Sequence, residues 1–148
     1  MKRIFTIIIL ILAFVVEGHS HTGLQIAELF NGAYERKDNA IEVVVKGNQL
    51  ERYKLEVFRS LTIKNDPKDF ERIEKLVEQD EKHAISKETG HIGERLYYAF
   101  YCFSPQKGRF RYIFYRNSSL RKTESNELTL IYMEGNVTMD ELKVMFKK

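Results

Sequence analysis

The chain has 148 residues, of which 43% are hydrophobic and 30% charged, and its net charge is +3 at pH 7. A charge this near zero gives no reason to expect a nucleic-acid partner, because nucleic-acid-binding domains carry a marked excess of Lys and Arg. The single cysteine, Cys102, excludes an internal disulfide, so the fold must rest on packing alone.

Residues 1–20 have the plan of a secretory signal peptide. Its parts are a basic pair, an apolar run and two small residues: Lys2 and Arg3, Ile4 to Val16, then Gly18 and Ser20. A helix of about 13 residues reaches ~20 Å, too short for a bilayer core of ~30 Å. We therefore expect cleavage between Ser20 and His21, which leaves 21–148 as a single domain with no membrane span. No cysteine lies near the cut, so no lipid anchor is expected.

The first half of the expected domain contains two helices and two strands. Apolar residues at helical spacing predict a helix over 23–36. The valine-rich stretch 40–46 predicts a strand, and Gly47 with Asn48 suggests a tight turn into a second strand over 50–64.

Strand 50–64 shows the clearest alternation. Most of its apolar residues fall on odd positions: Tyr53, Leu55, Val57, Leu61 and Ile63. Phe58 and Arg59 are neighbouring exceptions to the pattern. Period two predicts that these residues share one face and the polar residues the other. Since the phase is kept, the strand should either run straight or carry two extra residues, but not a one-residue bulge. If the strand runs straight, Arg59 lies among core residues. Its guanidinium then needs a carboxylate partner or must extend to solvent.

The second half is expected to form a helix, three strands and a final helix. Asp66 and Pro67 suit the N-cap and first position of the helix that continues over 68–83. The rest follows in order: a loop over 84–94, strands over 96–103, 109–116 and 127–134, and a helix opened by a Thr138–Glu141 capping box and ending at Phe146. Short connections favour antiparallel pairing. The predicted class is α+β, with three helices on a five-stranded, mainly antiparallel sheet in the order α-β-β-α-β-β-β-α.

No arrangement of residues points to catalysis, a metal or a cofactor. The nearest approach to metal-ligand spacing is His83, Glu88, His91 and Glu94. Gly90 and Gly93 interrupt any helix that would align these side chains, so no metal site is predicted. Cys102 lacks the flanking residues typical of a nucleophile and is predicted to be a buried, inert thiol. The stretch 107–115 alternates basic and aromatic residues as RNA-binding strands do, but its spacing differs and export removes it from RNA.

An aromatic and basic sheet face is the main indication of binding. If helices cover only one side of the sheet, tyrosines and arginines on the other side would suit anionic, sugar-like or peptide ligands. The candidate residues are Arg59, Tyr97, Tyr101, Arg109, Arg111 and Tyr115. The competing interpretation, favoured on general grounds, is that a helix covers this face or that the aromatics are cross-strand packing.

Four segments resemble a family of small secreted proteins of unknown function from Bacteroides-type bacteria. They are Phe58–Thr62, Leu96–Tyr101, Arg111–Asn117 and Leu130–Asn136, and the resemblance spans nearly all of the expected mature chain. It implies a Gram-negative host, and hence a periplasmic or secreted location. It implies no activity, and it carries over no catalytic residue.

Three functional hypotheses follow. The favoured one is a non-enzymatic periplasmic domain that binds a protein, peptide or glycan of the cell envelope. The alternative is an envelope hydrolase acting on glycan or peptide, which would need Arg59, His91 and a glutamate in one concave pocket. An open face bearing Tyr97, Tyr101, Arg109 and Arg111 would favour binding, and a purely structural role remains if neither arrangement is found.

Overall fold

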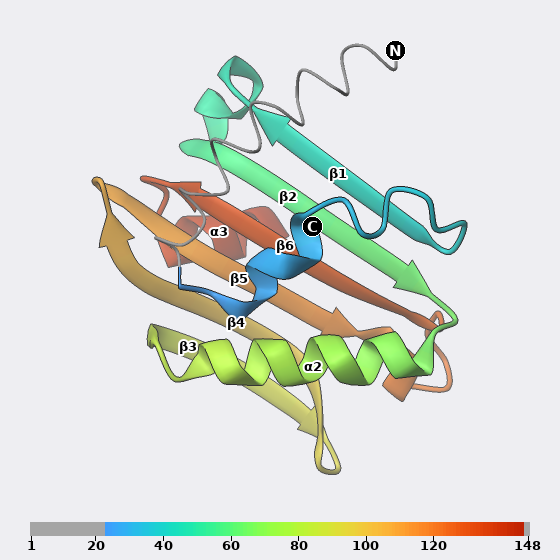
Figure 1. Cartoon of the computed structure of the whole chain (residues 1–148). Helices are drawn as coiled ribbons and strands as arrows, with labels where there is room; N and C mark the ends of the chain where they lie inside the picture. Colours follow the sequence, from blue (N-terminus) through green and yellow to red (C-terminus); the bar gives the residue numbers. More distant parts are fainter. Residues whose placement is uncertain (1–22, 147–148) are drawn as a thin grey trace.

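A computed structural model describes residues 23–146 (Figure 1). The expected signal peptide and its cut between Ser20 and His21 lie outside these residues. The elements are η1 (Gln25–Phe30), β1 (Ala40–Lys46), η2 (Asn48–Tyr53), β2 (Leu55–Lys64), α2 (Pro67–Glu81), β3 (Ala84–Ile92), β4 (Arg95–Gln106), β5 (Arg109–Asn117), η3 (Ser118–Leu120), β6 (Glu127–Gly135) and α3 (Met139–Phe146). The η segments are 3-10 helices.

The α+β class is confirmed, but the expected five strands and three helices are not, since the described residues contain six strands, two α-helices and three 3-10 helices. The described residues form one six-stranded sheet in the order β1-β2-β6-β5-β4-β3, with every neighbouring pair antiparallel. The additional strand is β3, in the stretch 84–94 that we expected to be a loop. β3 is an edge strand that is largely exposed, so it lacks the alternation that reveals a half-buried strand. Its backbone pairing with β4 makes it a strand.

The helix expected over 23–36 is also shorter than predicted. Only Gln25–Phe30 is helical, with 3-10 geometry, and turns follow it. Gly32 has a φ of +95°, outside the helical region, which breaks the helix where the pattern alone would continue it.

β2 contains the one-residue bulge that its sequence phase argued against. The pairing with β6 shifts between Leu55 and Val57, so Glu56 is the extra residue. Leu55 therefore belongs to the core on one face of the sheet, while Leu61 and Ile63 belong to the core on the other. The stretch before Leu55 is η2, so the connection after β1 is not a two-residue hairpin turn.

The bulge brings the start of β2 very close to the end of β6. A Cβ on Gly135 would lie 2.3 Å from the Lys54 backbone oxygen and 2.7 Å from the Leu55 Cα. The same Lys54 oxygen accepts hydrogen bonds from the amides of Asn136 and Val137. Position 135 thus has space only for glycine.

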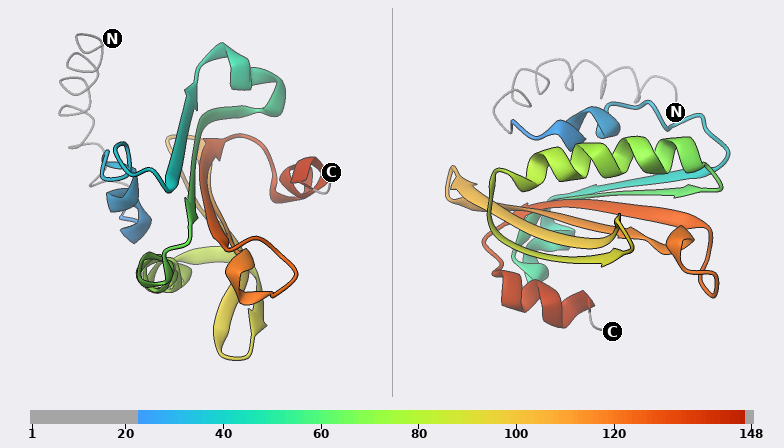
Figure 2. Two further views of the ribbon diagram at one scale, coloured as in Figure 1. Left: turned by 90° about the vertical axis from the view of Figure 1, so that its right-hand side faces the viewer. Right: turned by 90° about the horizontal axis from the view of Figure 1, so that it is seen from below.

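Both faces of the sheet are covered, as the edge-on views in Figure 2 show. η1 and α2 pack on one face, over a core that includes Ile26, Ile73 and Tyr115. η2 and α3 belong to the other face, with a smaller core that includes Leu50, Phe100 and Leu142. Over the middle of the sheet the open-face alternative therefore does not apply, and the favoured interpretation of a covered face describes the structure.

Local helix signals are confirmed. The Asp66 side chain accepts the amide of Asp69 at 3.2 Å, and Pro67 is the first residue of α2. Thr138 Oγ1 accepts the amide of Glu141 at 3.2 Å at the start of α3. No helix among residues 23–146 is long and apolar enough to cross a bilayer.

Candidate functional site

The six predicted binding residues separate into three groups. Tyr101 and Tyr115 are fully buried in the core beneath η1 and α2, so they offer no surface to a ligand. Burial also raises the pKa of both hydroxyls, which stay protonated. For Tyr101 and Tyr115 the competing interpretation, in which a helix covers the aromatic face, describes the structure.

The three arginines lie together on that face, at one end of the strands. Arg59 on β2 pairs with Tyr132 on β6, and the next position on the same face of β6, Glu134, pairs with Arg111 on β5. Arg59 and Arg111 are thus two strands apart and offset by two residues along the strands, a separation of ~12 Å. Arg109 follows on the same side and completes the set. We call Arg59, Arg109, Arg111, Tyr132 and Glu134 the arginine cluster.

Glu134 is the internal counter-charge of the arginine cluster. Its Oε1 accepts a hydrogen bond from the Tyr132 hydroxyl at 2.6 Å, and its Oε2 lies 3.5 Å from Nη1 of Arg109. Burial, and next the charge of Glu134, raise the pKa of Tyr132, so this hydroxyl remains a donor. Arg109 is also 2.7 Å from Oε2 of Glu56, the bulge residue. Glu134 and Glu56 are therefore both paired with Arg109.

Arg59 is more deeply buried than Arg109, and the charges near it include the Glu42 carboxylate on β1. Its side chain is 8% exposed, and its Nε has no hydrogen-bond acceptor among the described residues. A buried guanidinium N–H without an acceptor is costly, because the group has lost its water. Arg111 is equally buried, and its guanidinium lies 5.7 Å from the centre of the Phe103 ring. The cluster therefore concentrates positive charge on a partly desolvated surface.

Asp80 lies near the arginine cluster and holds the start of η1. The buried carboxylate of Asp80, at the end of α2, accepts the amides of Gln25 at 2.7 Å and Ile26 at 3.0 Å. Burial raises the pKa of Asp80, while these two hydrogen bonds and the charges of His83 and Arg111 act in the opposite direction. Asp80 thus joins the start of η1 to the end of the sheet where Arg111 lies.

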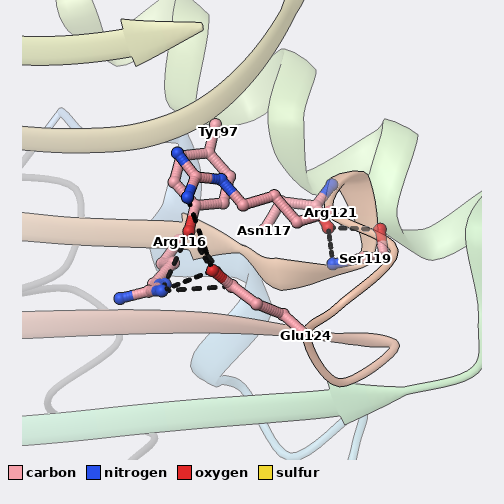
Figure 3. Close-up of polar contacts among 6 residues, drawn as sticks. All are labelled: Tyr97, Arg116, Asn117, Ser119, Arg121 and Glu124. Carbon is pink, nitrogen blue, oxygen red and sulfur yellow. Dashed lines mark hydrogen bonds and ion pairs between the residues drawn. The ribbon is translucent and has the colours of Figure 1, made fainter. Parts of the chain in front are cut away.

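Tyr97 belongs to a separate surface cluster, shown in Figure 3, that joins β4 to the loop after β5. Its hydroxyl donates to Oε1 of Glu124 at 2.8 Å, and Arg116 Nη2 donates to the Tyr97 hydroxyl at 2.8 Å. The guanidinium of Arg121 stacks on the Tyr97 ring at 4.5 Å. Hydrogen bonds from Tyr97 and Arg116 hold the pKa of Glu124 below its ordinary value. Since these groups satisfy one another, we interpret the cluster as a brace for the loop.

The remaining predicted features are dispersed. Arg59 and His91 lie on β2 and β3, with three strands between them, so they cannot share a pocket. No group of three or more His, Cys, Asp or Glu side chains suited to a metal occurs within residues 23–146. Cys102 is buried, as expected, and burial raises its pKa.

Sequence reasoning missed Tyr132 and Glu134, the acidic half of the arginine cluster. Their spacing of two on a strand puts them on one face, which the sequence shows. Their position beside Arg59 and Arg111 depends on the order of strands, since β6 lies between β2 and β5. Alternation alone therefore could not show that Tyr132 and Glu134 lie beside Arg59 and Arg111.

The fold and the cluster define an α+β domain with one basic, partly desolvated surface region. The chain belongs to a family described as a family of unknown function (DUF6108), whose match covers residues 13–146. Comparisons with curated proteins and with solved structures found no match. Membership of a family of unknown function agrees with the resemblance noted above, while the bacterial source and secretion remain predictions.

Proposed function

We propose that this protein is an exported, non-enzymatic binding domain of the Gram-negative cell envelope, and that the arginine cluster holds a carboxylate group of its ligand. Residues 1–20 support export, because they combine a basic start, a short apolar run and small residues before Ser20 and His21. The absence of a cysteine near that cut supports a periplasmic or secreted form without a lipid anchor.

The observation that carries the binding proposal is the gathering of Arg59, Arg109 and Arg111 around one internal carboxylate, Glu134, at one end of the sheet. A carboxylate suits this position, because guanidinium groups bind planar anions with paired, charge-assisted hydrogen bonds. Glu134 is already engaged, since it accepts from Tyr132 and pairs with Arg109. An acidic peptide or an acidic glycan of the envelope would bring a carboxylate to the exposed edge of the cluster, where the Arg109 side chain is 33% exposed.

Binding is favoured over hydrolysis by the position of the residues. The hydrolase alternative needed Arg59 and His91 in one pocket, and the sheet places them three intervening strands apart. The two carboxylates beside the arginine cluster, Glu134 and Glu56, both pair with Arg109, whereas acid–base hydrolysis uses two carboxyl groups of distinct protonation. We therefore do not propose an enzyme.

Calorimetric titration tests the proposal with four probes: triglutamate, trigalacturonate, and their neutral counterparts triglutamine and trigalactose. We expect one acidic probe to bind and its neutral counterpart not to bind, which also distinguishes a peptide from a glycan. Arg59→Met should weaken that binding at least about tenfold, whereas Arg36→Met, an exposed arginine outside the cluster, should not. Binding of neither acidic probe at millimolar concentration would overturn the assignment of the site.

The Arg59→Met variant also separates binding from folding. Replacing a buried, incompletely paired charge by an apolar side chain of similar length is expected to leave the free energy of unfolding unchanged or to raise it. A loss of several kcal/mol would instead show that Arg59 is a structural ion-pair partner.

Export is tested separately by N-terminal sequencing of protein from the periplasm, where an intact Met1 would contradict it.

A further inference from the structure

The two edge strands of the sheet, β1 and β3, are constructed differently. β3 pairs with β4 through two register shifts, and its charged residues Lys87 and Glu88 are engaged with Glu81 and Lys143. Bulges and charges are the usual means by which proteins prevent an edge from accepting another strand. β1, on the outer side of β2 in Figure 1, pairs with β2 over seven consecutive positions without a shift.

β1 also exposes apolar side chains on both of its faces. Ile41 is 58% exposed, Val43 41% and Val44 51%. Within residues 23–146, β1 pairs with β2 alone, so its other side presents a row of backbone N–H and C=O groups. A regular, valine-rich edge of this kind is a template for one more strand.

We propose that β1 pairs antiparallel with β1 of a second copy of this chain, forming a symmetric dimer with a continuous twelve-stranded sheet. The two-fold axis passes beside Val44, so that Val44 faces its own copy. Val43 then faces Val45, and Glu42 faces Lys46 of the second copy. A register centred on one residue keeps each side chain opposite one on the same face, as antiparallel pairing requires.

The charges of β1 select a second copy as the occupant. In this register each dimer contains two Glu42–Lys46 pairs, directly opposite one another, which is the arrangement that stabilises antiparallel strands. Centring on Val43 instead would place Glu42 opposite Val44 and Lys46 opposite Ala40. The strand is thus complementary in charge to itself when turned around the Val44 axis.

The surroundings of Glu42 and Lys46 leave room for a further opposite charge. The Oε2 atom of Glu42 is buried and has no hydrogen-bond partner among the described residues. Burial, and next the charge of Glu35, raise the pKa of Glu42, while the charge of Arg59 acts in the opposite direction. Burial and the nearby charge of Arg59 lower the pKa of Lys46, while the charge of Glu134 acts in the opposite direction. Each group therefore lies where an opposite charge from another chain would stabilise its ionised form.

Analytical ultracentrifugation of the purified protein tests the dimer through charge reversal. Glu42→Lys and Lys46→Glu, each alone, place like charges opposite one another at two positions and should raise the dimer dissociation constant at least about tenfold. The double variant Glu42→Lys/Lys46→Glu restores opposite charges in reversed order. It should recover a dissociation constant within about threefold of the unaltered protein.

A second pair of variants tests the axis. Val44→Lys would set two ammonium groups face to face and should give a monomer, whereas Ile41→Lys, at a similarly exposed position outside the paired stretch, should leave a dimer. Far-ultraviolet circular dichroism confirms that each variant is folded. A protein that is monomeric at about 100 µM, or a double variant no tighter than the single variants, would overturn the proposal.

Discussion

Asp80 is expected to hold η1 to helix α2. Its two carboxylate oxygens accept the amides of Gln25 at 2.7 Å and Ile26 at 3.0 Å, and the residue is fully buried. Hydrogen bonds to a charged group contribute ~1.5–3 kcal/mol each, and a buried donor left without a partner costs a similar amount. Asp80→Ala removes both acceptors but also relieves the burial of a carboxylate, so we expect a net loss of about 3 kcal/mol.

Urea unfolding measures this loss, and hydrogen exchange locates it. Asp80→Asn retains one acceptor oxygen and should lose roughly half as much stability as Asp80→Ala. The amide of Ile26 should exchange faster in both variants, because η1 can open without the rest of the sheet. The control is Glu81→Ala, at the adjacent position, whose exposed pair with Lys87 should contribute less than about 0.5 kcal/mol.

The reasoning would be refuted by an Asp80→Ala protein within about 1 kcal/mol of the unaltered chain. Unchanged exchange at Ile26 would refute it as well. Either result would mean that apolar packing of η1 through Ile26 and Leu29, and not the carboxylate, holds this segment.

Three further predictions follow from local contacts. Gly135→Ala should destabilise the protein by more than about 3 kcal/mol in urea unfolding, because the added Cβ meets backbone that cannot move aside, while Gly90→Ala should lose less than about 1 kcal/mol. The lowered pKa of Glu124 means that the loop brace contributes stability above the ordinary carboxyl pKa and loses it as pH falls through the lower, folded value. In an NMR titration the pKa of Glu124 should lie below the ordinary pKa of a glutamate side chain, and Tyr97→Phe should raise it. Cys102 is buried with a raised pKa, so a thiol reagent at pH 8 should label it only after denaturation, and labelling of the native protein would contradict its inert role.

Features that depend on neighbours along the chain were predictable. Strand β1 was expected over its observed bounds, Ala40–Lys46, because valines favour strands whatever they pair with. The cap at Asp66 and the capping box at Thr138 were expected because a side chain bonds an amide three residues away. The buried state of Cys102 followed from the apolar strand around it.

Features that depend on distant neighbours were not predictable in the same way. β3 is a strand because β4 supplies its hydrogen bonds, and its own composition shows little of this. The bulge at Glu56 exists because β2 must pair with β6 while Leu55 reaches one core and Leu61 the other. The alternation of β2 was visible, but the change of face within it was not.

The candidate site shows the same division. Composition and pattern by themselves determined an α+β domain with one cysteine, no evident catalytic motif and several arginines and tyrosines on strands. Only the tertiary structure decided that η1 and α2 cover Tyr101 and Tyr115, and that β6 brings Tyr132 and Glu134 between Arg59 and Arg111. The physical reason is that alternation assigns a residue to a face, whereas the order of strands and the position of helices determine what that face meets.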